Sequence, residues 1–197
     1  MLPFDEPLSN LDARLRRTMR EEIRALQQRL GLTVAYVTHD QGDALAVSDR
    51  IIVINRGVIA QEGTPQDLYE RPASEFVAGF MGEAMLLHAT WGEAGQVLLG
   101  GHPVHARGSG SAGSPGDAVA LAVRPEAWRI GRPGQGEIDG TVAKAAHLGS
   151  TREYSFATVL VVTFVVTHDT ALALRTGERV SLRIAGTCAV VDPDPGT

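Results

Sequence analysis

Two adjacent carboxylates near the start of the chain have the residue types best suited to chemistry. Asp5 and Glu6 follow the apolar segment Leu2–Phe4, which its composition predicts to be the end of a β-strand. Ligands of open α/β sheets bind at the carboxyl ends of the strands. There one carboxylate can hold Mg²⁺, directly or through water, and the next can polarise an attacking water. A bare Asp-Glu pair is by itself more typical of a solvated turn with a helix-capping charge.

A histidine at the end of a second predicted strand changes that balance. Thr33–Thr38 has the composition of a buried strand, and His39 and Asp40 follow at its carboxyl end. If this strand pairs with the first, their ends lie about 5 Å apart. A histidine that faces two carboxylates across a phosphate site is a candidate sensor of a terminal phosphate. The alternative is a purely structural histidine.

A long amphipathic helix is predicted between the two strands. Ser9 or Asn10 can cap it, Asp12 suits its positive N-terminal end, and Gly31 ends it. Its apolar residues recur every three or four positions and predict one buried stripe: Leu15, Met19, Ile23, Leu26 and Leu30. Its charged residues are interpreted as a solvated face: Arg14, Arg16, Arg17, Arg20, Glu21 and Glu22.

The rest of the chain divides by its glycine content. Residues 1–82 hold six of the 22 glycines and predict alternating strands and helices, with helices at 41–47, 65–70 and 74–81 and strands at 50–55 and 58–62. Residues 83–197 hold sixteen glycines and predict short strands at 85–90, 96–99, 118–124, 136–146, 153–167 and 178–184. We therefore expect an α/β domain over 1–82 and an all-β, OB-like barrel over 83–197.

Composition excludes several classes of protein. The 197 residues are 44% hydrophobic with a net charge of −5, which is typical of a globular protein and argues against a nucleic-acid partner. We expect no membrane-spanning helix and no signal peptide, because no apolar run is long enough. The single cysteine, Cys188, suits a reducing compartment. The single lysine, Lys144, is outside any Gly-Lys-Ser/Thr sequence, so no phosphate-binding P-loop is present.

Some isolated features favour structural interpretations. His102 and His105 have a spacing that permits a metal site, but an ordinary loop is the preferred interpretation. Trp91 and Trp128 are expected to be core or interface residues, and Cys188 is expected to be packed. The uncharged segment Phe156–Val166 predicts a buried strand, with an aggregation-prone edge as the alternative.

Two motifs resemble ABC-transporter nucleotide-binding subunits. Phe4–Ala13 resembles their Walker B segment followed by the D-loop, and Tyr36–Gln41 resembles their switch-histidine segment. Ser48–Ile51 and Gly63–Pro65 are similar to the family's segments beyond the switch histidine. The second half resembles the TOBE regulatory domain of maltose-, polyamine- and ferric-iron-type import ATPases, and Val123–Glu126 is similar to its entry motif.

The resemblance implies roles for particular residues. Asp5 would hold Mg²⁺ through water, Glu6 would be the general base for hydrolysis of ATP, and His39 would contact the γ-phosphate. Three residues would form the D-loop, which contacts the opposite subunit in the family: Ser9, Asn10 and Asp12.

The resemblance also implies an ATP-hydrolysing, energy-coupling subunit of an import system, with a preference for the iron or polyamine subgroup. Its partners would be a second copy, joined through the D-loop and the TOBE domain, transmembrane permease subunits and, indirectly, a periplasmic or extracellular binding protein. Its place would be cytoplasmic, peripheral on the inner face of the membrane. The fold would be a P-loop NTPase domain without its P-loop strand, followed by the TOBE barrel.

The family's Walker A, Q-loop and signature motifs precede Walker B and are absent from these 197 residues. We therefore expect a truncated chain that is inactive alone. We also expect its N-terminal part to be unstable, because the sheet lacks a strand and Pro3 interrupts another. Two alternatives stay open: a non-catalytic regulatory, dimerisation or ligand-binding module built on the TOBE barrel, and a non-functional gene product.

Overall fold

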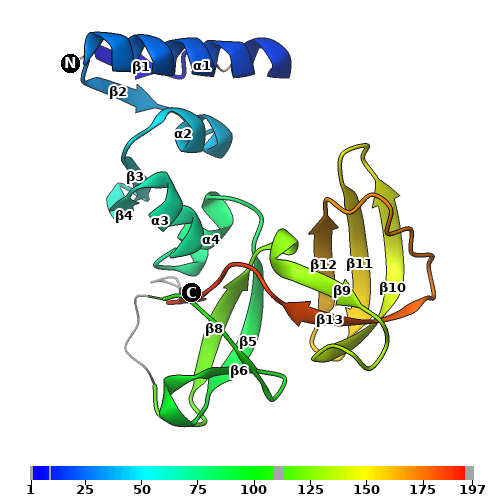
Figure 1. Cartoon of the computed structure of the whole chain (residues 1–197). Coiled ribbons are helices and arrows are strands. Elements are labelled where there is room, and N and C mark those ends of the chain that lie inside the picture. Colours follow the sequence, from blue (N-terminus) through cyan, green and yellow to red (C-terminus); the bar gives the residue numbers. More distant parts are fainter. Residues whose placement is uncertain (1, 9, 109–112, 194–197) are drawn as a thin grey trace. The chain divides into compact units, whose positions relative to one another are not determined.

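The computed structural model describes residues 2–8, 10–108 and 113–193 (Figure 1). The chain forms two compact units, Met1–Tyr69 and Glu70–Thr197, which we call the N-terminal and C-terminal units. The first mixes helices and strands, and the second consists mainly of strands. The domain boundary expected at residues 82 and 83 stays a prediction. No helix among the described residues is long and apolar enough to span a bilayer.

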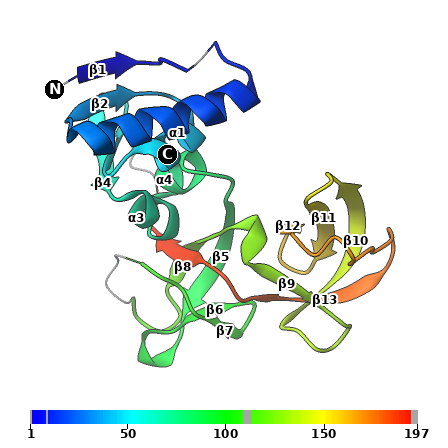
Figure 2. The same ribbon diagram turned by 45° about the horizontal axis from the view of Figure 1, so that its top comes forward.

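The N-terminal unit is built around two small sheets. Its elements are β1 (Leu2–Asp5), α1 (Ala13–Leu30), β2 (Val34–Val37), α2 (Gln41–Val47), β3 (Ile51–Asn55), β4 (Val58–Gly63) and most of α3 (Pro65–Glu70). Strands β1 and β2 pair in parallel, with α1 as the crossover helix alongside them (Figure 2). Strands β3 and β4 form a separate antiparallel hairpin, as the turn residues Arg56 and Gly57 predict. Both turn residues have positive φ, which suits the twist of a hairpin.

The N-cap of α1 differs from the predicted Ser9 or Asn10. Asp12 is itself the N-cap, because its side chain accepts hydrogen bonds from the backbone N–H groups of Arg14 and Leu15. Asn10 lies before it in an exposed turn, and Ser9 lies outside the described residues. Gly31 ends the helix with φ of 61°, as predicted.

The predicted burial of α1 is wrong in part. None of its residues is buried, and three leucines of the apolar stripe are 44–55% exposed: Leu15, Leu26 and Leu30. The stripe residues Met19 and Ile23 are half-buried, and four residues of the predicted solvated face are exposed as expected: Arg14, Arg17, Glu21 and Glu22. The other two residues of that face, Arg16 and Arg20, are half-buried and pair with Asp40 and Asp43.

The C-terminal unit contains helix α4 (Glu75–Phe80) and two five-stranded antiparallel sheets. One sheet has the order β14-β8-β5-β6-β7, with bounds Cys188–Val191, Ala118–Val123, Met85–Trp91, Val97–Leu99 and His102–Val104. The other has the order β12-β11-β10-β13-β9, with bounds Val162–Thr167, Arg152–Thr158, Ile138–His147, Arg179–Ile184 and Trp128–Gly131. Two single-turn helices, η1 (Glu93–Gly95) and η2 (Pro125–Ala127), connect strands.

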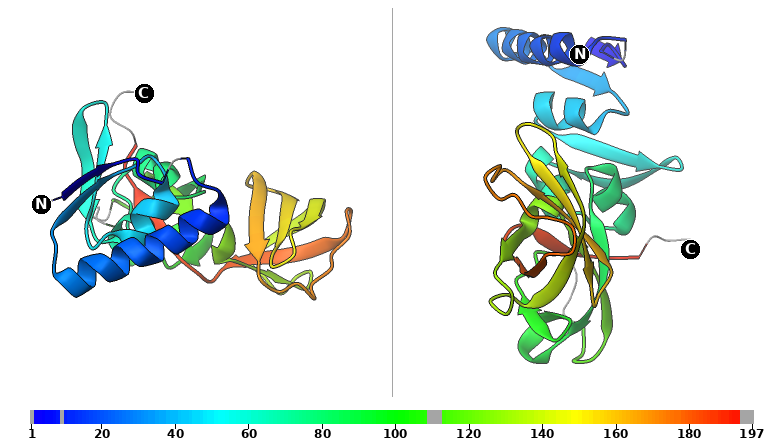
Figure 3. Two further views of the ribbon diagram at one scale, coloured as in Figure 1. Left: turned by 90° about the horizontal axis from the view of Figure 1, so that it is seen from above. Right: turned by 90° about the vertical axis from the view of Figure 1, so that its right-hand side faces the viewer.

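The sequence missed three of these strands and merged two others. It assigned no strand to β7, β9 or β14, which have three or four residues each and so give little periodicity. The segment predicted as one strand over 153–167 is the hairpin of β11 and β12. The result is two curled sheets (Figure 3), which refines the expected single barrel.

Both sheets contribute to one core. Its largest fully buried side chains include Leu121 from one sheet and Tyr154, Phe156 and Leu182 from the other, with Trp128 beside them. The predicted packing of Trp128 and Cys188 is confirmed, and burial raises the pKa of the Cys188 thiol to about 11. This thiol is therefore protonated and unreactive at neutral pH.

A buried arginine explains the Val123–Glu126 motif. The Arg124 side chain is buried and its Nη1 donates to the carbonyls of Ala78 and Glu83, at 2.8 and 3.1 Å. Ala78 lies in α4, so the contact satisfies a carbonyl near the negative C-terminal end of that helix. Arg124 thereby ties β8 to the segment that follows α4.

Candidate functional site

The ends of β1 and β2 bring two predicted site residues together. In the parallel register Asp5 lies opposite Val37, and the Glu6 N–H donates to the Val37 carbonyl at 2.9 Å. One step beyond, His39 Nδ1 lies 2.5 Å from Glu6 Oε1. The predicted juxtaposition of the carboxylate pair with the histidine is therefore what the fold produces.

The backbone of Glu6 is unusual. Its φ is 43°, in the left-handed region that side-chain-bearing residues occupy at a cost of about 1–2 kcal/mol. The hydrogen bond to Val37 holds this conformation, in which the chain leaves the strand and the Glu6 side chain meets His39. Such conformations concentrate at functional sites.

The His39 and Glu6 side chains stay accessible to a ligand, being 73% and 43% exposed. The hydrogen bond that His39 donates to Glu6, and then the negative charge of Glu6, raise the pKa of His39. A carboxylate only accepts hydrogen bonds, so Nδ1 carries the proton in this pair. When the ring is charged, Nε2 carries a second N–H that can be donated to an anionic ligand.

The other predicted residues occupy distinct positions. Asp5 is the exposed last residue of β1 and directly precedes Glu6. Asn10 is exposed in the turn before α1. The Asp12 carboxylate accepts the first N–H groups of α1, so it holds the helix start.

Among the described residues, no group of three or more His, Cys, Asp or Glu side chains is arranged to hold a metal ion. The pair His102 and His105 belongs to no such group. Mg²⁺ usually binds one or two protein carboxylates together with waters and substrate phosphates. The single exposed carboxylate of Asp5 fits that mode of binding, with waters and phosphates as the remaining ligands.

An ion-pair network beside the histidine was missed. Arg16 donates to Asp40 at 2.7 Å, Arg20 pairs with the buried carboxylate of Asp43, and Arg24 donates to Asp49 at 2.5 Å. The arginines are spaced by four, so they share one face of α1. That spacing, with three aspartates following the second strand, is the signal that could have predicted the contact.

The network sets the charge state of its members. Burial raises the pKa of Asp40, but the Asp43 N–H and the guanidinium groups of Arg20 and Arg16 outweigh it, so the pKa lies below its usual value. Burial, followed by the charge of Asp43 and the hydrogen bond to it, raises the pKa of Tyr36 to about 12. His39 therefore has a permanently charged neighbour in Asp40.

Comparisons with known proteins agree with these motifs. Residues 121–191 match the family model of the TOBE domain. A protein of Agrobacterium fabrum named Fe(3+) ions import ATP-binding protein FbpC is 50% identical over 177 residues. The chain is homologous to the C-terminal portion of ABC import ATP-binding subunits.

The homology extends along most of the chain. The Agrobacterium alignment covers 86% of this chain and 48% of the relative. Proteins with the same name from Brucella melitensis and Vibrio cholerae are 48% and 46% identical, over 94% and 78% of this chain and 54% and 43% of the relatives. The chain thus spans about half the length of the relatives it matches.

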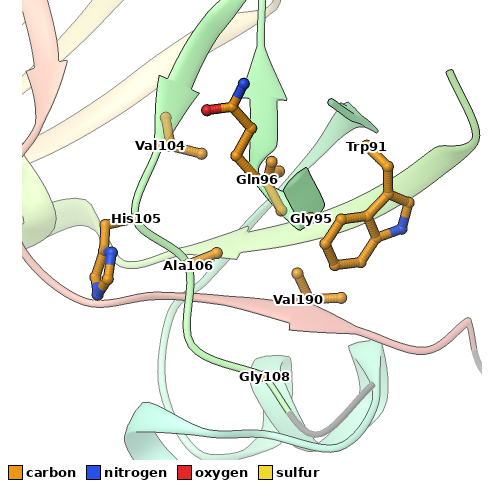
Figure 4. Close-up of a pocket in the computed structure, with 9 residues that line it drawn as sticks. Trp91, Gly95, Gln96, Val104, His105, Ala106, Gly108 and Val190 are labelled. Carbon is orange, nitrogen blue, oxygen red and sulfur yellow. The ribbon is translucent and has the colours of Figure 1, made fainter. Parts of the chain in front are cut away.

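A pocket of about 340 Å³ lies in the C-terminal unit, largely outside the TOBE match (Figure 4). The Trp91 ring forms one side, and aliphatic side chains of Val97, Val104 and Val190 line it. Gln96 and His105 supply its polar groups. The composition suits a small amphipathic ligand.

Proposed function

We propose that this chain is part of an ATP-hydrolysing, energy-coupling subunit of an ABC import system, with its catalytic residues on the N-terminal unit. The hydrogen bond between Glu6 and His39, at the ends of two parallel strands, carries the proposal. It brings a candidate base and a candidate phosphate-binding group together at the edge of the sheet where nucleotides bind. The homology to ATP-binding import proteins supports it.

Each residue has a specific proposed role. Glu6 accepts a proton from the water that attacks the terminal phosphate, and His39 donates Nε2–H to an oxygen of that phosphate. Asp5 holds Mg²⁺ through water. Bound Mg²⁺ supplies charge neutralisation to the phosphates of ATP.

The contact between Glu6 and His39 is compatible with these two roles. The Glu6 carboxylate lies next to the His39 ring and is 43% exposed, so an attacking water can reach it. A carboxylate has about four acceptor positions, enough for His39 and for a water molecule. His39 in turn stays oriented by its Nδ1 contact while Nε2 faces the ligand.

The cargo, the partners and the place follow from the same proposal. The relatives are named for the import of Fe(3+) ions, and we propose ferric ion as the cargo of the system that this chain serves. An external binding protein would deliver the ferric ion, and transmembrane permease subunits would transport it across the membrane. A second copy would contact Asn10 and Asp12 and the TOBE domain, at the cytoplasmic face of the membrane.

A chimera tests the proposal. This chain replaces the matching portion of the Agrobacterium relative, and ATP hydrolysis is measured with Mg²⁺. We expect hydrolysis that Glu6→Gln reduces at least about 100-fold and His39→Ala strongly, whereas Arg17→Gln on the exposed side of α1 retains it. A folded, ATP-binding chimera that Glu6→Gln leaves active would refute the catalytic roles.

The 197 residues by themselves are expected to show no steady-state hydrolysis, since they contain no Gly-Lys-Ser/Thr sequence to hold the phosphates. A steady-state ATPase assay measures the hydrolysis, and calorimetry with MgATP measures whether the 197 residues bind the nucleotide. Micromolar binding by the 197 residues would show that another site replaces the P-loop.

A second candidate function is a regulatory module that binds a small ligand. The pocket beside Trp91 in the C-terminal unit favours it. Quenching of tryptophan fluorescence by a small-molecule panel, abolished by Val190→Phe, which fills the pocket without adding a tryptophan, would support this function. Absence of any such response would leave the catalytic proposal unaffected.

A further inference from the structure

The side chain of Arg16 joins two turns that are far apart in the sequence. Its Nη1 donates to Asp40 Oδ2 at 2.7 Å, and its Nη2 donates to the Leu11 carbonyl at 3.3 Å. Asp40 directly follows His39, and Leu11 lies in the turn formed by residues 10–12. The Arg16 side chain is only 25% exposed, which limits competition from water.

The histidine end of this bridge is firmly held. Asp40 Oδ1 accepts the N–H of Asp43 at 2.9 Å and caps α2, while the N–H of Asp40 donates to Thr38 Oγ1 at 3.0 Å. A shift of the Asp40 carboxylate therefore moves the start of α2 and the turn that carries His39.

The other end is attached to the start of α1. The N–H of Leu11 donates to the carbonyl of Leu8, whose side chain is buried, and Asp12 caps the helix on which Arg16 stands. Residues 10–12 thus form a short turn between two fixed points, with the Leu11 carbonyl turned toward Arg16.

We propose that Arg16 is a positioning residue that couples the 10–12 turn to the His39 turn. A planar guanidinium holds two acceptors in fixed directions, so displacement of either turn breaks or drags the other contact. The inference rests on the proposed function, in which residues 10–12 face a second subunit and His39 faces the nucleotide. When the second subunit contacts residues 10–12, Arg16 therefore changes the position of His39.

Lysine distinguishes this bridge from simple charge pairing. It keeps the positive charge but has one compact ammonium in place of two separated N–H directions. Arg16→Lys is therefore expected to hold Asp40 or Leu11, whereas Arg16 holds both. Arg17→Lys is the matched control, because Arg17 is the neighbour of Arg16 in α1 and pairs with Glu21 at the exposed surface.

The experiment measures amide hydrogen exchange on the chimera without nucleotide, because the N-terminal unit is expected to be unstable in the 197 residues alone. Arg16→Lys is expected to raise exchange about tenfold at residues 10–12 and at residues 39–43 together, with Arg17→Lys unchanged at both. Asp40→Asn is the second variant, because asparagine still caps α2 while it loses the charge that Arg16 binds. It is expected to raise exchange at residues 10–12, the far end of the bridge.

Three results would overturn the coupling. The first is unchanged exchange at residues 10–12 in Asp40→Asn, and the second is exchange in Arg16→Lys equal to that of the unsubstituted chimera. The third is an equal rise of exchange in β3 and β4, which indicates general loosening. All three are measured without ATP. Failure of the coupling therefore leaves the hydrolysis test of the chimera intact, and an inactive chimera leaves the coupling intact.

Discussion

Among the described residues, one cluster of sixteen buried side chains lies in the C-terminal unit, to which both five-stranded sheets contribute. The described part of the N-terminal unit has two separate two-stranded sheets and few buried apolar side chains. Among its described residues, α1 contacts α2 and the flanking turns through ion pairs whose arginine side chains are 22–27% exposed. Burial of apolar surface stabilises by about 25 cal/mol per Å², whereas the attraction within a partly buried ion pair is offset by the cost of removing both charges from water. The unit that carries Glu6 and His39 is therefore the one with the weaker core.

The N-terminal unit also leaves many apolar side chains in contact with water. Large side chains of the N-terminal unit are exposed on α1 and on both sheets: Leu2, Leu15, Leu26, Leu30, Val37, Ile52, Ile54, Val58 and Ile59. Two-stranded sheets with exposed apolar faces have little independent stability. This observation supports the expectation that the N-terminal part is unstable by itself.

The largest effect is expected in the core of the C-terminal unit. Phe156→Ala should lower its unfolding free energy by about 3–5 kcal/mol, because a buried ring leaves a cavity. Both tryptophans, Trp91 and Trp128, belong to this unit, so denaturant unfolding followed by tryptophan fluorescence reports on it alone. A loss below about 1 kcal/mol would contradict the contrast between the units.

The next effect concerns the ion-pair network. Asp43→Ala should destabilise the N-terminal unit by about 2 kcal/mol, less than for a fully buried pair because Arg20 keeps some contact with water and with Asp40. Amide exchange in β1, β2 and α2 measures it, with Arg17→Ala as the control. Unchanged fluorescence unfolding of the C-terminal unit would show that the units respond separately.

A change in titration is expected from Glu6→Gln. The pKa of His39 is raised by Glu6, so loss of the carboxylate should return it toward about 6.5, as NMR titration of the imidazole would measure. Because the folded-state pKa is raised, the stabilisation by this pair is present below the unfolded pKa and is lost as pH rises through the folded value. An unchanged His39 pKa would mean that the contact is absent in solution.

The smallest effect is expected on the exposed stripe of α1. Leu26→Ser should change the unfolding free energy of either unit by less than about 0.5 kcal/mol, since Leu26 is half exposed. It should reduce self-association at high concentration, as light scattering would show. Strong destabilisation would mean that the stripe is covered in solution.

The sequence predicted the site better than its surroundings. Strand ends, turn residues and the motif at Asp5, Glu6 and His39 are local features, so β1, β2 and the hairpin at Arg56 could be predicted from short segments. The family resemblance supplied the TOBE domain in the same way, because its motifs are short and specific. The catalytic roles of Glu6 and His39 stay predictions, as do the roles of four further residues: Asp5, Ser9, Asn10 and Asp12.

Other features depended on tertiary contacts. Helical periodicity predicts the two faces of α1 but not which residues another element covers. Arg16 and Arg20 are half-buried because the aspartates around α2 pair with them. The strands β7, β9 and β14 exist because neighbouring strands supply their hydrogen bonds, which their few residues cannot indicate. Sequence determined which residues could meet at the strand ends. The tertiary structure decided that Arg16 reaches both Leu11 and Asp40, since that contact requires two distant turns to lie within reach of one side chain.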